Sequence, residues 1–487
     1  MIESNDSVTD ANRWQIGVFF KNYWLKLILC TALVCILFWG ATRTRNYLHV
    51  STNNKVDELS QQAENALAEN KYTEALQLYR QILDYHPNYT QAYLQQAGIY
   101  VTKNKLTTAE ETLLQALKQN TDQEAVYLAL GEVALAANDY AAATNYLLFS
   151  DTTKPDNQLK LTEVYLRQGD IIEAQKWLSK VLENTGTGSK PHYYYAIIHL
   201  ASEKSESALS EITLANEIAV ENQNFTAQDI YRQLKVSIQN VETAESEIFG
   251  RALIGFTLLQ EKYPRLALIP LQKVANEKPD YRDGQAMLGA AYLSIKDYES
   301  AEYALERALD LDPNYAYAHY LLGLIYEQKE QNDLAQQTYK AAVTFAPSQI
   351  TYHRIYTNLL EECEKYIEAE LAYRDILNSE LFANTEKSEF KVRLAYLYLD
   401  HLDKLQEGLS LAQEYKNSEL HAWALYKNEQ SPEALAIVEQ LIKEQPTAWL
   451  YYRQGKIMAD LGQIREAKTS LDRAVDLDTE GKIPAIL

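Results

Sequence analysis

Residues 281–313 read YRDGQAMLGAAYLSIKDYESAEYALERALDLDP and contain the pattern that decides the fold. Gly289, Ala301 and Pro313 are evenly spaced along this stretch. The same pattern recurs one period earlier and one period later, and such a fixed period is the signature of a repeat architecture. The sequence therefore predicts a stacked array of similar units. The positions that define the register are Gly255, Ala267, Pro279, Gly289, Tyr292, Ala301, Pro313, Gly323, Tyr326, Ala335 and Pro347.

Each unit is expected to be a pair of antiparallel helices. Small side chains such as Gly289 and Ala301 let the two helices approach closely, and large ones such as Tyr292 and Leu305 fill the remaining space. A proline inside a helix removes a backbone hydrogen bond, so Pro313 ends the second helix and begins the next unit. One unit cannot bury its apolar face alone, and the units therefore stack into a solenoid.

The repeat extends on both sides of this centre. The interval from Ala208 to Ala267 is much longer than one period, and the stretch 228–236 has the apolar spacing of an additional helix. This insertion either interrupts the solenoid, dividing it into two arrays, or leaves it continuous. In each unit, the second helix is expected to have a small residue at the position where it contacts the first helix. These residues are Ala75, Ala109, Ala143, Ala174, Ala208, Ala267, Ala301, Ala335, Ala369, Gly408, Ala434 and Ala467.

The pattern resembles the tetratricopeptide repeat family, which has its signature spacing at Leu288, Gly289, Tyr292, Ala301, Leu305, Ala308 and Pro313. The resemblance implies an all-α fold, a right-handed α-solenoid of about 12 helix-turn-helix repeats. It also implies that the first helix of each unit lines a concave groove for protein or peptide partners. The groove residues it implies are Phe249, Phe256, Tyr317, Tyr320, Arg354, Asn358, Arg393, Trp449, Tyr452 and Arg453.

One subtype of this family clamps the C-terminal carboxylate of chaperones with Lys and Asn. Arg354 and Asn358 have the spacing of one such pair, and Arg393 follows one unit later. The remaining basic pair is not in register, so a chaperone-tail clamp is not expected.

The segment before the repeats is strongly apolar. Leu27–Ala41 reads LILCTALVCILFWGA without a charge, and Tyr23 and Trp24 lengthen it toward the ~17 residues that cross a bilayer. We expect an uncleaved transmembrane helix, with a cleaved signal peptide and a buried globular helix as competing interpretations. Lys and Arg number three on each side, so charge leaves the orientation open, and we favour an extracytoplasmic repeat array.

The expected organisation has seven parts. They are a polar N-terminal segment (1–22), a transmembrane helix (23–42), a linker (43–55), an N-terminal repeat array (56–221), an inserted helix or connector (222–247), a C-terminal repeat array (248–479) and an apolar tail (480–487).

Composition and motifs exclude several functions. The 46 Lys and Arg against 67 Asp and Glu give a net charge of −21, which opposes unaided binding to nucleic acid. The chain has 3 cysteines, too few for a disulfide framework, and no nucleotide-binding, zinc-protease or hydrolase motif. His319 and His353 stand one repeat apart but lack the carboxylate or Cys support of a metal site. We therefore expect a protein that is not an enzyme and has no cofactor, metal site or evident small-molecule substrate.

Three functions fit these features. The favoured one is a membrane-anchored scaffold that binds protein or peptide partners in its groove, in the assembly of an envelope or membrane complex. The others are a chaperone-like factor with transient clients and, by family analogy, an accessory subunit of cell-surface polysaccharide synthesis. An acidic surface favours partners with basic or aromatic segments, although the charge also serves simply to keep a long solenoid soluble.

Overall fold

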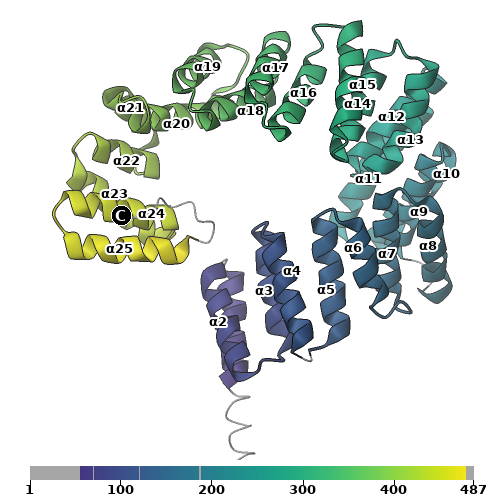
Figure 1. The fold of residues 1–487 in the computed structure, drawn as a ribbon, viewed down its shortest axis with the longest axis horizontal. Coiled ribbons are helices and arrows are strands. Elements are labelled where there is room, and N and C mark those ends of the chain that lie inside the picture. Colours follow the sequence, from purple (N-terminus) through teal and green to yellow (C-terminus); the bar gives the residue numbers. More distant parts are fainter. Residues whose placement is uncertain (1–54, 70, 120, 186–187, 479–487) are drawn as a thin grey trace, which may run out of the picture. The chain divides into compact units, whose positions relative to one another are not determined.

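The computed structural model describes residues 55–69, 71–119, 121–185 and 188–478. These residues form α-helices and one short 3-10 helix, connected by turns, and they contain no strand (Figure 1). The all-α prediction is therefore confirmed for this part of the chain.

The predicted transmembrane helix at 23–42 lies outside the described residues. The same holds for the polar segment at 1–22, for most of the linker and for the tail at 480–487. None of the helices that the structure describes is long and apolar enough to cross a bilayer.

The chain divides into two compact units, the first ending at Val126 and the second beginning at Tyr127. This boundary lies inside helix α5. The first unit contains a helix at 55–68, α2 (Tyr72–Tyr85), α3 (Thr90–Thr102), α4 (Leu106–Lys118) and the start of α5 (Gln123–Ala136).

The second unit contains the remaining helices, which follow one another in antiparallel pairs except at α11. They are α6 (Tyr140–Leu148), α7 (Pro155–Gln168), α8 (Ile171–Thr185), α9 (Ser189–Ala201), α10 (Ser205–Glu221), α11 (Phe225–Glu242), α12 (Glu247–Gln260), α13 (Pro264–Glu277), α14 (Arg282–Ser294), α15 (Tyr298–Leu311), α16 (Ala316–Gln328), α17 (Asn332–Phe345), α18 (Ile350–Glu362), α19 (Tyr366–Asn378), α20 (Asn384–Asp400), α21 (Leu405–Ala412), η1 (Gln413–Tyr415), α22 (Glu419–Lys427), α23 (Ser431–Glu444), α24 (Ala448–Asp460) and α25 (Ile464–Leu477).

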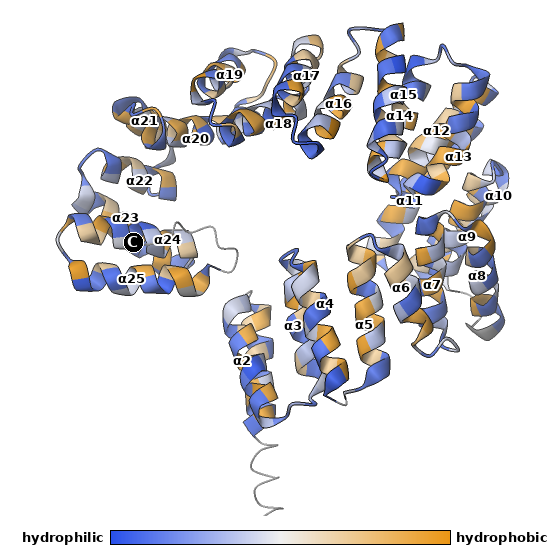
Figure 2. Cartoon of the chain, in the orientation of Figure 1, coloured by the Kyte–Doolittle hydropathy of each residue, from blue (hydrophilic) through white to orange (hydrophobic). Residues whose placement is uncertain are grey.

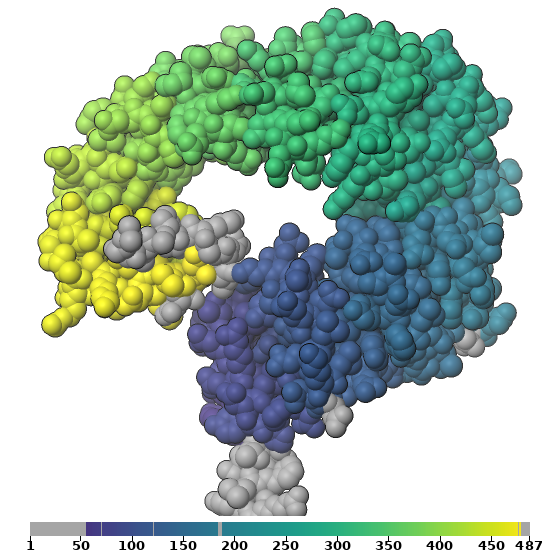
Figure 3. Space-filling model, viewed as in Figure 1, coloured from purple at the N-terminus to yellow at the C-terminus, as the bar shows by residue number. Residues whose placement is uncertain are grey.

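Successive pairs of the second unit follow a curve. The first helices α18 and α20 lie on its inner side, and the second helices α19 and α21 lie on its outer side (Figure 1). In the space-filling view, the surface from α12 to α25 is continuous and curved (Figure 3). From α18 to α21, the inner side of the curve is therefore formed by first helices.

Each helix pair is held together along apolar stripes, which Figure 2 shows beside hydrophilic ones. The small residues that the sequence predicts for second helices, from Ala75 to Ala467, all lie in second helices, and all are buried. Ala267, Ala301 and Ala335, for example, have no exposed surface. The repeat register was thus a reliable guide to the helix pairing.

The glycines of the register mark the closest approach inside a pair. A Cβ at Gly289 would lie 2.6 Å from Cγ of Leu305, which stands on the partner helix. Gly323 likewise faces the ring of Tyr339, and Gly255 faces Leu271. The two residues of each pair have the same separation in the sequence as Gly289 and Leu305. A distance under about 3 Å is shorter than carbon van der Waals contact, so only glycine fits without a shift of the partner side chain.

The prolines lie where the second helices end. α15 ends at Leu311 and α17 ends at Phe345, each just before a proline of the register. The proline carbonyl then accepts a hydrogen bond from a side chain at the start of the next first helix. The tethers are Gln285 Nε2 to Pro279 O (3.2 Å), His319 Nε2 to Pro313 O (2.9 Å), His353 Nε2 to Pro347 O (2.9 Å) and Tyr93 Oη to Pro87 O (3.1 Å).

Helix α11 lies within the stretch predicted as an insertion. Its side chains Tyr231, Leu234 and Ile238 are buried in the same hydrophobic core as residues of α9, α10, α12 and α13. The core therefore continues through α11, whereas the boundary between the two compact units lies far earlier in the chain, at Val126.

Replacing Gly289 by Ala tests the close contact inside a pair. The added methyl group overpacks against Leu305, so we expect the free energy of unfolding to fall by about 1–3 kcal/mol. Gly98→Ala is the matched control, because nothing lies within 4 Å of a Cβ at that position of α3. Alanine is the better helix former, so the control is expected to gain about 0.5–1 kcal/mol. Urea unfolding followed by circular dichroism measures the free energy of unfolding of both variants. An equal increase of this free energy in Gly289→Ala and Gly98→Ala would contradict the role of Gly289.

Candidate functional site

Aromatic side chains gather on the first helices α12, α16 and α18. Phe249 and Phe256 stand two helical turns apart on one face of α12, and their exposed fractions are 42% and 38%. Large apolar side chains are usually more buried than this, so two of them on one helical face form a surface suited to a partner. Their place in the groove stays a prediction.

Three tyrosines form a stack that joins α16 to α18. The ring centroids of Tyr317 and Tyr320 are 6.4 Å apart, and those of Tyr320 and Tyr352 are 4.9 Å apart. Burial raises the pKa of all three hydroxyls, so the stack is uncharged at neutral pH. Tyr352 was missed from the sequence because it stands just beyond one repeat period from Tyr317.

The predicted arginines of α18 and α20 form ion pairs with glutamates of the same two helices. Arg354 forms a bidentate pair with Glu389, with Nη2 to Oε2 at 2.9 Å and Nε to Oε1 at 3.2 Å. Arg393 bonds to Asn358 and, through Nη2, to Glu361 at 3.0 Å. Both guanidinium groups thus already hold a carboxylate, so neither is free to clamp a partner's carboxylate.

The predicted residues of α24 divide into two environments. Trp449 is 40% exposed and meets Tyr452 edge to face, with centroids 5.6 Å apart. Arg453 is only 8% exposed: its Nη1 lies 3.2 Å from Glu419 Oε1, and its guanidinium stacks over Trp423 at 4.9 Å. Arg453 therefore holds α24 against α22, while Trp449 and Tyr452 remain candidates for a binding surface.

The two histidines that the sequence places one repeat apart have structural roles. His319 and His353, spaced by one repeat, are used as the tethers to proline carbonyls described above. Within the described ranges, no group of three or more His, Cys, Asp and Glu side chains could hold a metal ion. We therefore define the candidate site as the inner aromatic surface, made of Phe249, Phe256, Tyr317, Tyr320 and Tyr352.

Family models of one repeat family match several parts of the chain. A tetratricopeptide repeat model matches 66–133, a TPR repeat model matches 289–330, and a second tetratricopeptide repeat model matches 316–349 and 450–480. The chain is a tetratricopeptide repeat protein. The matches fall in both compact units, and the predicted resemblance to this family is confirmed.

Solved structures with similar folds are distant. A monomeric mutant of IFIT1 with m7Gppp-AAAA is 12% identical, with 79% of this chain and 90% of that chain covered and a TM-score of 0.30. The yeast Tom70 crystal structure is 14% identical, with 87% and 96% covered and a TM-score of 0.29. The APC/C hetero-tetramer Cut9–Hcn1 is 12% identical, with 88% and 94% covered and a TM-score of 0.32. Comparison with curated proteins gives no match. TM-scores this low carry no inference about the arrangement or the partners of this TPR protein.

His353 makes the stability of the second unit depend on pH. Burial lowers the pKa of its imidazole below the ordinary value of 6.5, although the bond to Pro347 opposes this. The unfolded chain therefore binds a proton at a higher pH than the folded chain does. We expect stability to fall as the pH drops below about 6.5 and to level off below the folded pKa.

The variant His353→Gln should flatten this part of the pH dependence. Glutamine keeps a donor toward the proline carbonyl, as Gln285 does in the equivalent position. Urea midpoints at about pH 7.5 and about pH 5 measure the effect, and His319→Gln controls for loss of a histidine from the other tether. If the two midpoints of His353→Gln differ as much as those of the unsubstituted protein, the assignment of this pH dependence to His353 is wrong.

Proposed function

We propose that this protein is a non-catalytic scaffold that binds protein or peptide partners on the inner aromatic surface of its second unit. The observation that carries the proposal is the stack of Tyr317, Tyr320 and Tyr352 on α16 and α18, together with the exposed Phe249 and Phe256 on the first helix α12. Aromatic side chains contribute large contact areas at a small cost in conformational entropy, which is why they dominate binding energy at interfaces. The ion-paired arginines of α18 and α20 favour partners that bind through apolar or aromatic groups.

We further propose that residues 23–42 anchor the scaffold in a membrane, with the repeats outside the cytoplasm. The uncharged run and its flanking aromatic residues support this part. An anchored repeat array would keep its partners at the membrane, as the assembly of an envelope or membrane complex requires.

Site-specific photo-crosslinking in membranes tests the binding surface. A photoreactive phenylalanine analogue at Phe256 should give a discrete crosslinked product, and Tyr320→Ala should reduce its yield several-fold by disrupting the stack. The same analogue at Tyr303 is the control, because that side chain is 68% exposed but lies on a second helix, α15. Equal product yields from positions 256 and 303 would refute the proposed surface.

Alkaline extraction and cysteine labelling test the anchor. We expect the full chain to stay in the membrane pellet and a variant that lacks residues 1–54 to be released. Cys363 is partly exposed, so an impermeant maleimide should label it in intact cells if the repeats face outward. Release of the full chain by alkali would exclude an integral anchor, and labelling of Cys363 only after lysis would reverse the orientation.

A further inference from the structure

The inserted helix α11 changes how the neighbouring pairs of the second unit meet. α11 packs against α10 before it and α12 after it, yet α12 also contacts α9 directly. α13 contacts both α7 and α9. α13 is the second helix of its pair, and α7 and α9 are first helices of earlier pairs. Among the described helices, no other second helix makes a comparable contact with the first helix of an earlier pair. The chain therefore makes a corner at α11, where pairs far apart in the sequence lie in contact.

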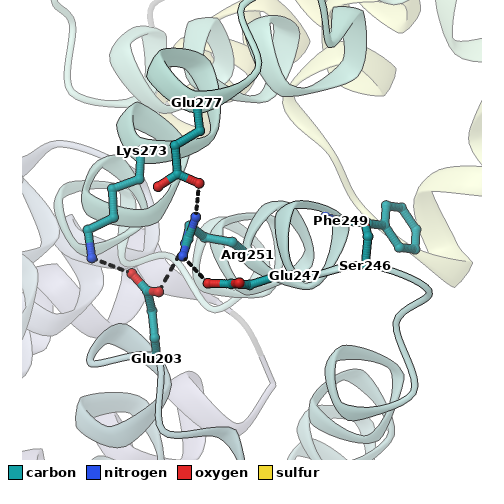
Figure 4. Close-up of polar contacts among 7 residues, drawn as sticks. All are labelled: Glu203, Ser246, Glu247, Phe249, Arg251, Lys273 and Glu277. Carbon is teal, nitrogen blue, oxygen red and sulfur yellow. Dashed lines mark hydrogen bonds and ion pairs between the residues drawn. The ribbon is translucent and has the colours of Figure 1, made fainter.

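One group of ion pairs joins the two sides of this corner, as Figure 4 shows. Arg251 of α12 is 8% exposed, and its Nε donates to Glu203 Oε2 at 3.0 Å, in the turn between α9 and α10. Lys273 of α13 reaches the other oxygen of Glu203 at 2.6 Å. Arg251 also bonds to Glu247 at 2.7 Å and to Glu277. We call this group the Arg251 latch.

A second group joins α7 and α9 to the turn between α12 and α13. Arg167 of α7 donates from Nη1 to the carbonyl of Lys262 at 3.1 Å, far away in the sequence, and its guanidinium lies 5.4 Å from the centre of the Tyr263 ring. Tyr193 of α9 donates its hydroxyl to Glu261 at 2.8 Å. Burial raises the pKa of the Glu261 carboxyl, and the hydrogen bond from Tyr193 acts in the opposite direction. We call this group the Arg167 latch.

Both latches use charged groups that are costly to separate. Removing the partner of a buried charge leaves that charge without compensation, so the two sides of the corner cannot part without losing several hydrogen bonds at once. A plain TPR array has no such restraint, since each repeat contacts only its neighbours. We propose that α11 and the two latches form a locked corner that fixes the angle between the pairs α7–α8 and α12–α13, and thereby the course of the inner surface.

The test measures the corner itself and needs no partner, so its result is independent of the proposed binding function. Spin labels are placed at Ile172 on α8 and Tyr303 on α15, which are 78% and 68% exposed, in a chain whose three cysteines are replaced by serine. Electron spin resonance on the full chain in detergent should give one narrow distance distribution. We expect Glu203→Gly combined with Arg167→Gln to broaden or shift that distribution.

The substitution of Glu203 spares the local fold. The backbone of Glu203 has a φ of 57°, which glycine accepts without strain, and Arg251 keeps Glu247 and Glu277 as partners. Glu330→Gly is the matched control: it has a φ of 58° in the equivalent turn between α16 and α17 and contributes nothing to either latch. The control should leave the distribution unchanged.

A distribution identical to the parent in the double variant, with helicity retained, would overturn the locked corner. If the double variant loses helicity by circular dichroism, Glu203→Gly alone decides the question. Broadening in that single variant beyond the Glu330→Gly control supports the proposal, and a distribution equal to the control refutes it.

Discussion

In the pairs α12–α13, α14–α15 and α16–α17, the two helices meet closely where the first helix has a glycine and therefore no side chain. Gly289 against Leu305 and Gly323 against Tyr339 are contacts that a methyl group would break. The alanine that follows each glycine on the partner helix is buried by the same approach. This packing holds the first helices α12 and α16, which carry most of the inner aromatic surface, against their partners α13 and α17. The candidate binding site therefore depends on contacts that take no part in binding.

The features that recur with the repeat period could be predicted from the sequence. Packing against the next helix pair constrains the same positions in every unit, so Gly255, Gly289 and Gly323 marked the first helices, and the prolines marked the ends of the second. The extra helix at α11 was also visible, as an interval longer than the period. Local spacing sufficed for these features because each depends on residues of one unit or its neighbour.

The environment of the candidate surface could not be predicted in the same way. Arg354 and Arg393 are predicted to face the groove, yet both are paired with carboxylates, and Arg453 is buried beneath aromatic rings. These outcomes depend on which side chain the adjacent helix presents, and that residue varies from repeat to repeat. Contacts across α11, such as Arg167 with the carbonyl of Lys262, join positions that no period relates. Side-chain pairing between irregular segments thus required the three-dimensional structure.

Native-state hydrogen exchange tests most directly the claim that close helix pairs hold the second unit together. The slowest amides should be those of the helices that meet at Gly255, Gly289 and Gly323. In rising denaturant, the consecutive pairs α12–α13, α14–α15 and α16–α17 should open with one common free energy, because each pair packs directly against the next. Amides at these contacts that exchange as fast as those of the connecting turns, or pairs that open with unrelated free energies, would contradict the account.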